Sequence, residues 1–214
     1  MPDWVRYGTN GGPARGGGEI DQLPLAPPFP CRAARVPPPK LSGIVEADET
    51  YHLASQKGSR NLDRPARKRG GKAARRGISR EFDCILVVRD RTRNTCAVVT
   101  GRGPVTAQQL ATHLLPVLAC DALLVSDAAR AYQAFARSTG ISHEIVNVQA
   151  GMRVRGAMHI QGVNGWHGRF KTWLRRFNGV ASRYLNHYAA WQQVLDAAAL
   201  TTPRQWLCAA VAGR

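Results

Sequence analysis

Hydrophobic and polar residues alternate along IVEADETYHL, residues 44–53, with the period of two that is typical of a β-strand. This pattern places Ile44, Glu46, Asp48 and Thr50 on one face. Val45, Ala47 and Tyr51 fall on the other face. The segment therefore predicts a strand that carries acidic side chains among mainly apolar neighbours.

The rest of the chain shows the patterns of further strands and helices. FDCILVVRD and NTCAVVTG are rich in β-branched residues, and the short RTR between them predicts a hairpin. ALLVSD is typical of a short buried strand, and HEIVNV predicts another strand. Helical spacing of apolar residues follows Thr106 in TAQQLATHLLPVL, and a second such segment, AARAYQAFARSTG, ends at Gly140. Residues 163–178 and YLNHYAAWQQVLDAAAL, residues 184–200, predict two more helices.

Read in order, the elements are a strand, a hairpin, a helix, a strand, a helix, a strand and helices. This order predicts an α/β domain with a mixed sheet flanked by helices, which we expect to span residues 41–195. Residues 1–40 contain six Gly and nine Pro. We expect that segment to be disordered, because it cannot bury enough apolar surface to offset its ordering entropy. Residues 196–214 are expected to form a C-terminal tail.

Basic residues dominate the charge of the chain, whose formal net charge is +16 over 214 residues. A surplus of this size, without any run of about 20 apolar residues, favours a polyanionic partner such as DNA over a membrane. Residues 57–80 hold ten Lys or Arg and one acid, and they predict a long basic loop. The candidate DNA contacts in it are Arg67, Lys68, Arg69, Lys72, Arg75 and Arg76. The five scattered cysteines form no C-x2-C pair, which favours reduced thiols in a cytoplasmic protein.

The predicted helix over residues 163–178 has two distinct faces. At 100° per residue, its stripe of large apolar side chains would face the core. Asn164, Lys171 and Arg175 gather on the opposite side, with His167 at the edge of that polar face. Asn164 could instead be the N-cap of a helix that starts at Gly165, and the basic residues could be a solvated face or bind phosphate without catalysis.

Two aspartates stand at unusual positions: one within a strand, where a carboxylate lowers stability, and one at a strand end, where ligand groups are common. Asp48 lies within a strand, where Asp is depleted, and Asp127 ends the apolar run ALLVS. Asp127 could also cap the next helix, an Arg or Lys could pair with Asp48, and Glu46 and Glu49 could share its role. Two carboxylates with a third oxygen ligand suit Mg²⁺, and two such ions about 3.5–4 Å apart support phosphoryl transfer. Asn164 would supply a neutral oxygen, and Lys171 could contact a phosphate.

Three segments together, VEADETY, SDAARAY and HIQGVNGWHGRFKTWLRRFNGVASRYLNHYAAW, resemble a transposase of bacterial insertion sequences. The resemblance is to the branch of the DDE superfamily whose third position is Asn, followed by Lys. It implies an RNase H-like fold, with Asp48, Asp127 and Asn164 at a site for Mg²⁺ or Mn²⁺ and Lys171 beside them. It further implies hydrolysis of a strand at the ends of the element, followed by attack of the freed 3′-hydroxyl on target DNA. The DNA partners would be transposon ends and target DNA, and a homo-oligomer would hold the paired ends. The protein would be associated with the bacterial nucleoid.

The chain departs from that family in two respects. Ala128 and Ala129 follow the second aspartate where a glycine is common, which would crowd the site. Residues 1–40 hold no paired cysteines of the zinc ribbon that usually precedes a helix-turn-helix in such proteins. We therefore expect a truncated or frame-shifted copy. Two alternatives remain: an inactive remnant that binds DNA non-specifically, or a related RNase H-like nuclease.

Overall fold

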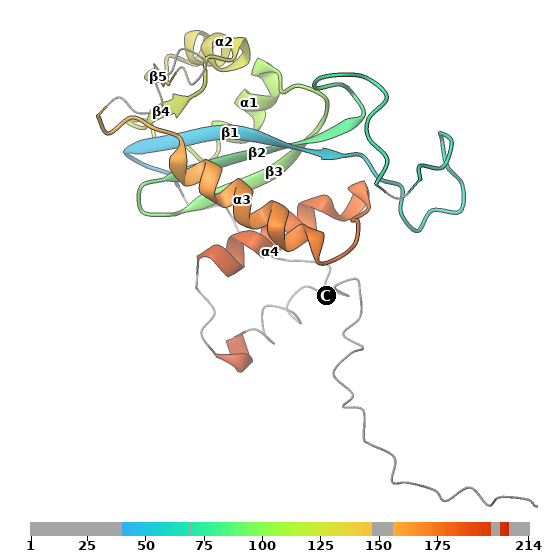
Figure 1. Cartoon of the computed structure of the whole chain (residues 1–214). Helices are drawn as coiled ribbons and strands as arrows, with labels where there is room; N and C mark the ends of the chain where they lie inside the picture. The colour runs from blue at the N-terminus through green and yellow to red at the C-terminus, as the bar shows by residue number, and fades with distance from the viewer. Residues whose placement is uncertain (1–39, 69, 147–155, 198–201, 206–214) are drawn as a thin grey trace, which may run out of the picture.

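A mixed five-stranded sheet forms the centre of the computed structural model, which describes residues 40–68, 70–146, 156–197 and 202–205 (Figure 1). The strands are β1 (Ile44–Leu53), β2 (Phe82–Asp90), β3 (Thr95–Arg102), β4 (Leu123–Ser126) and β5 (His143–Ile145). They lie in the order β3-β2-β1-β4-β5. The pairs β1–β2 and β2–β3 are antiparallel, whereas β1–β4 and β4–β5 are parallel. This RNase H-like arrangement confirms the predicted fold class.

Helices cover both faces of the sheet. The first pair, α1 (Ala107–Leu114) and α2 (Arg130–Thr139), makes the two crossovers that the parallel strands require. The second pair, α3 (Gln161–Arg175) and α4 (Leu185–Asp196), packs on the opposite face and is joined through the short 3₁₀ turn η2 (Ser182–Tyr184) (Figure 1). No helix in these described segments is long and apolar enough to cross a membrane.

The alternation along β1 sorts its side chains between these two layers. Val45 and Ala47 are fully buried in the cluster that also contains Leu124 and Tyr132, on the α1 and α2 side. Glu46 and Asp48 face α3, since the Glu46 carboxylate accepts a hydrogen bond from the Val163 amide at the start of that helix. The predicted two-faced strand is thereby confirmed, and its acidic positions lie under the third helix.

Local chemistry explains where the helices begin and end. Thr106 and Gln109 form a capping box at the start of α1, in which each side chain accepts a hydrogen bond from the other residue's amide. Gly140 ends α2 in the left-handed conformation, with φ of 73°. The third helix begins at Gln161, three residues before Asn164. The alternative in which Asn164 caps a helix starting at Gly165 is therefore wrong.

Helix α4 protects the outer edge of β3, which has no neighbouring strand in the described sheet. The Gln193 side chain accepts from the Ala97 amide at 2.9 Å, and the Asn186 side chain accepts from the Val99 amide at 2.7 Å. These two side chains act as a substitute for a sixth strand and block pairing with another chain. At the end of α4, Asp196 pairs with Arg89 and Arg169, so the packed region reaches one residue beyond the expected boundary at residue 195.

The two predicted terminal segments fall mainly outside the described residues. Residues 1–39 lie outside them, as do 198–201 and 206–214 of the expected tail. The expectation of a disordered N-terminal segment therefore stays a prediction. The cysteines that the structure describes, Cys84, Cys96 and Cys120, form no disulfide.

Candidate active site

Asp48 and Asp127 are brought together by the parallel pairing of β1 and β4. The register pairs Val45 with Leu124 and Glu46 with Val125. Two residues farther along each strand, the same register sets Asp127, directly after the last residue of β4, opposite Asp48. Paired residues on neighbouring strands point to the same side of a sheet. Asp48 therefore lies on the α3 side with Glu46, and Asp127 lies at the carboxyl end of β4, near enough for its charge to act on Asp48.

The electrostatic surroundings of Asp48 are those of a crowded carboxylate. Its pKa is raised from 3.8 to about 6, chiefly by burial and also by the charge of Asp127. The amide of Glu49, which donates to Asp48 Oδ1 at 2.9 Å, and the charge of Lys171 act in the opposite direction. The side chain is nevertheless 21% exposed. A cation that reached it would relieve the crowding, because it would offset the repulsion between the two carboxylates.

Asp127 makes a local hydrogen bond but is not the cap of α2. Its Oδ1 accepts from the Ala129 amide at 3.0 Å, which is an Asx-type turn. The N-cap of α2 is Ala129, and no side chain bonds there. Asp127 is half-buried and Ala128 is exposed. The capping alternative for Asp127 is thus wrong in detail, and the predicted crowding by the two alanines stays a prediction.

The polar face of α3 lies beside Asp48. Asn164 is exposed in the first turn of the helix, immediately after Val163, whose amide bonds to a side chain of β1. Lys171 is exposed two turns farther along, and its charge acts on Asp48. The residues of the predicted apolar stripe are buried or half-buried, and Trp166 and Phe170 stack with ring centroids 4.9 Å apart. The helix is therefore anchored by its rings and presents Asn164 and Lys171 outward.

His167 lies between those two residues and beside Asp48. Its Nδ1 is 3.8 Å from Asp48 Oδ2, and the imidazole is buried. Burial, together with the charge of Lys171, lowers its pKa from 6.5 to about 4. The ring is consequently neutral at pH 7, and the pair is not an ion pair. His167 therefore packs beside Asp48 as a neutral ring.

The two glutamates beside Asp48 have separate positions that the sequence left undecided. Glu49 points to the α2 side, where Tyr132 donates a hydrogen bond to its carboxylate at 2.5 Å. Burial raises the pKa of Glu49 to about 7 despite that bond, and the charges of Asp48 and Asp127 add to the effect. Glu46 is buried on the α3 side. Tyr132 thus supports Glu49 and belongs to the core.

The donor set fits a hard divalent cation. Among the described residues, no three His, Cys, Asp or Glu side chains are grouped so as to hold a metal by themselves. Two half-exposed carboxylates and an exposed amide leave room for water and substrate oxygens. Mg²⁺ is commonly held in this way, by one or two carboxylates and phosphate oxygens, whereas a structural zinc site needs four protein ligands.

The basic loop is anchored at both ends and exposed between them. Arg67 donates to the Ala54 carbonyl and pairs with Glu81, so its charge is offset by a carboxylate at the end of the loop. The Lys57 ammonium donates to three backbone carbonyls of residues 177–179, which follow α3, at 3.0–3.4 Å. The predicted DNA contacts that are exposed are Lys68, Lys72, Arg75 and Arg76, and on α3 Lys171 and Arg175. Arg69 lies outside the described residues.

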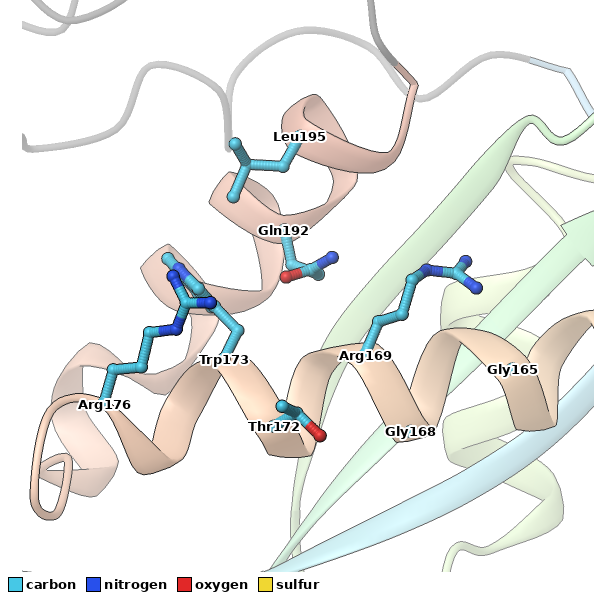
Figure 2. A pocket seen from close by; sticks show the side chains of 8 residues that line it. All are labelled: Gly165, Gly168, Arg169, Thr172, Trp173, Arg176, Gln192 and Leu195. Carbon is cyan, nitrogen blue, oxygen red and sulfur yellow. The ribbon is translucent and has the colours of Figure 1, made fainter.

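A groove of about 560 Å³ runs between α3 and α4 (Figure 2). It is lined by Gly165, Gly168, Arg169, Thr172, Trp173, Arg176, Gln192 and Leu195. On the helix these positions are centred roughly a third of a turn from Asn164 and Lys171. Arg169 is already paired with Asp196 at 2.5 Å. The groove is therefore separate from the aspartates, and the chemistry of the site lies outside it.

The chain is similar to a protein of a transposable element and, in structure, to a chain of a viral intasome. A protein in the transposable element ISH50 of Halobacterium salinarum, itself uncharacterised, is 28% identical over 158 residues, which are 73% of this chain and 53% of that protein. The chain thus spans about half the length of this curated relative. A chain in the cryo-EM structure of a simian T-cell lymphotropic virus intasome aligns with 79% of this chain and 55% of its own length. Its TM-score is 0.43 at 13% identity.

The family comparison is the more extensive one. The model of the ISXO2-like transposase domain matches residues 40–193, which include the whole sheet, α3 and most of α4. Asp48, Asp127 and Asn164 all fall within that range. The chain belongs to the ISXO2-like transposase domain family.

Proposed function

We propose that this chain catalyses metal-dependent cleavage and transfer of DNA strands at the ends of an insertion sequence. The observation that supports the proposal is the parallel pairing of β1 and β4, whose last pair, Glu46 and Val125, stands two residues before Asp48 and Asp127, together with the action of the Asp127 and Lys171 charges on Asp48. Carboxylates paired in this manner, partly exposed and mutually repelling, suit a divalent cation and a phosphate. Membership in a transposase family supports DNA as the substrate.

Each residue has a separate role in the proposed site. Asp48 and Asp127, with Asn164 as the neutral third member of an Asp-Asp-Asn site, would hold Mg²⁺ or Mn²⁺, two ions in all. Such ions would activate the attacking oxygen and stabilise the leaving oxygen at the scissile phosphate. Lys171 would contact a non-bridging phosphate oxygen and hold the strand against α3. The buried rings of α3 would keep that helix fixed while DNA is exchanged.

The DNA would extend from this site over the basic surface. Lys68, Lys72, Arg75 and Arg76 would contact phosphates, together with Arg69 and, on α3, Arg175. Arg67 would act indirectly, because its ion pair with Glu81 holds the base of the loop. Two transposon ends held together for transfer would require a homo-oligomer.

Strand transfer by the purified chain tests this function. Linear DNA ending in the terminal repeats that flank the gene would be incubated with supercoiled plasmid and Mg²⁺ or Mn²⁺. We expect joined products from the wild type and none from Asp48→Ala or Asp127→Ala, with DNA affinity retained. The control Asp121→Ala removes an exposed carboxylate from the turn before β4 and should leave the product unchanged.

The opposite result would assign a different role. DNA binding without joined product in either metal would contradict the proposal and favour a DNA-binding remnant. Cleavage that depends on branched or hybrid structure, with no need for a terminal repeat, would favour an RNase H-like nuclease.

A further inference from the structure

Glu46 is a buried carboxylate that the proposed chemistry does not use. Its residue exposure is 2%, although a buried charge is costly unless it is paired and hydrogen-bonded. Its Oε2 accepts from the Val163 amide at 2.9 Å. Its Oε1 pairs with the Arg91 guanidinium and lies 3.3 Å from His159 Nδ1. The carboxylate is therefore fully engaged, and each of these partners comes from another part of the chain.

The start of α3 needs the group that Glu46 supplies. The N-cap position is occupied by Ile160, which has no side chain that can accept a hydrogen bond, and the first turn holds no acidic residue. The first amides of a helix have no partner within the helix, and the positive end of its dipole attracts an anion. Glu46 meets both needs from β1, so it acts as a cap that comes from a different element.

The fit of the helix against Glu46 is close. A Cβ added to Gly162 would lie 2.9–3.1 Å from the Glu46 carboxylate atoms, nearer than real Cβ contacts. Gly168 lies six residues farther along the same helix, and a Cβ added there would have no atom within 4 Å. The glycine at residue 162 therefore allows the first turn to approach the carboxylate, whereas the one at residue 168 serves no such contact.

Arg91 ties the segment before α3 to the same carboxylate. It lies at the β2–β3 turn and donates to the Ala157 carbonyl at 2.6 Å and to the His159 carbonyl at 3.4 Å. One guanidinium thus connects the hairpin, the residues that lead into α3, and Glu46. Arg93, in the same turn, is exposed and serves as a charge-matched comparison.

We propose that Glu46 is a positioning residue: with Arg91, it fixes the first turn of α3 so that Asn164 meets Asp48 and Asp127. Glu46 and Asp48 are two residues apart on one face of β1, and Val163 immediately precedes Asn164. Strand β1 thereby carries Asp48 and, through Glu46, also positions the helix turn that carries Asn164. This inference rests on the proposed function for the role of Asn164, but the capping contact itself does not.

Two measurements on the full-length chain test the proposal without using strand transfer. The first is the affinity for Mn²⁺ by titration calorimetry in the absence of DNA. The second is hydrogen exchange of the Val163 amide, compared with amides within α4. The variants are Glu46→Gln and Arg91→Ala, with Arg93→Ala as control, and Gly162→Ala, with Gly168→Ala as control.

We expect Glu46→Gln, Arg91→Ala and Gly162→Ala to weaken Mn²⁺ binding about 10-fold, as losses of supporting residues around metal ligands do. We also expect faster exchange at Val163 in Glu46→Gln and Arg91→Ala, with α4 unchanged. Both control variants should match the wild type. Gly162→Ala keeps every charge. It therefore distinguishes the effect of a displaced first turn of α3 from the effect of losing the Glu46 carboxylate.

Unchanged Mn²⁺ affinity and unchanged exchange at Val163 in Glu46→Gln would overturn the positioning role. Equal losses in Arg93→Ala would overturn it too, because they would indicate a general charge effect. A wild-type chain that binds no Mn²⁺ would instead contradict the proposed function. In that event the exchange comparison would still decide whether Glu46 caps α3.

Discussion

Asp48 occupies a position that destabilises its ionised form. Burial and the neighbouring Asp127 raise its pKa to about 6, and Glu49 on the other side of the strand has a pKa of about 7. Their ordinary values are 3.8 and 4.5. A carboxyl whose pKa is higher in the folded state binds its proton more tightly there. The ionised forms therefore weaken the fold, as is common where a site is built for a ligand.

This difference gives a pH dependence with a defined sign. In metal-free buffer, Asp48 and Glu49 should make the free energy of unfolding fall as pH rises from about 4 to about 7, and the effect should level off above that. Asp48→Asn removes one of the two groups. We expect this variant to be more stable than the wild type by about 1–3 kcal/mol at pH 8, with little difference at pH 4. Urea denaturation at both pH values measures the difference.

The control for that measurement is Asp121→Asn, at an exposed carboxylate. It should follow the wild-type stability at both pH values. Equal stability of Asp48→Asn and the wild type at pH 8 would show that Asp48 is not destabilised by its surroundings. Added Mn²⁺ should stabilise the wild type more at pH 8 than at pH 5, because the ion competes with protons for the carboxylates.

At the scale of elements, the site depends on helices that are held to the sheet by side chains rather than by backbone pairing. The stacked rings and apolar residues of α3 bury its inner face, and Glu46 caps its start. Helix α4 is attached differently. Gln193 and Asn186, seven residues apart on one side of the helix, accept hydrogen bonds from β3. The third and fourth helices are then joined where Arg169 pairs with Asp196.

Gln193→Leu tests this attachment. The substitution keeps the approximate size of the side chain but leaves the Ala97 amide without its acceptor. We expect a loss of about 1–3 kcal/mol in the free energy of unfolding, the cost of an unsatisfied buried donor. Thermal or urea denaturation measures it. Gln108→Leu, at an exposed position on α1, should change stability by less than about 0.5 kcal/mol. Similar effects of the two substitutions would contradict the proposed protection of the strand edge.

At the scale of the whole molecule, the exposed positive charges are distributed so that DNA phosphates could bind along the surface. The net charge of +16 is spread over many elements, but the loop between β1 and β2 concentrates ten basic residues. Within it, Lys68, Lys72, Arg75 and Arg76 are exposed, whereas Arg67 is bound to Glu81. Contacts between such residues and phosphates release counterions. The number of phosphate contacts can therefore be measured from the salt dependence of DNA binding.

The double substitution of Arg75 and Arg76 by Ala should reduce the slope of log affinity against log salt by about 2, because each phosphate contact contributes about 0.9. Fluorescence anisotropy with a duplex of arbitrary sequence is sufficient to measure it. The matched control replaces Arg130 and Arg137, two exposed arginines on α2, and should leave the slope unchanged. Equal reductions in both variants would mean that binding follows total charge and not the loop.

Much of this organisation was predictable from local patterns. The period of two in β1, the capping residue Thr106 and the terminating Gly140 depend on neighbouring residues, and the structure confirms each of them. The polar and apolar sides of α3 follow equally from helical spacing, and the order of elements indicated the mixed sheet. The identity of the candidate site residues was also read from three short segments, while their function stays a proposal.

Contacts between distant segments could not be read in this way. Glu46 and Glu49 have the same chemistry and lie three residues apart, yet one caps α3 and the other bonds to Tyr132 on the far side of the sheet. Arg67 resembles its basic neighbours in sequence and is distinguished only by its ion pair. The sequence alone determined which elements form, because propensity and periodicity act over a few residues. Only the tertiary structure decided which charges are engaged and which are free to bind, because pairing depends on segments that are far apart in the chain.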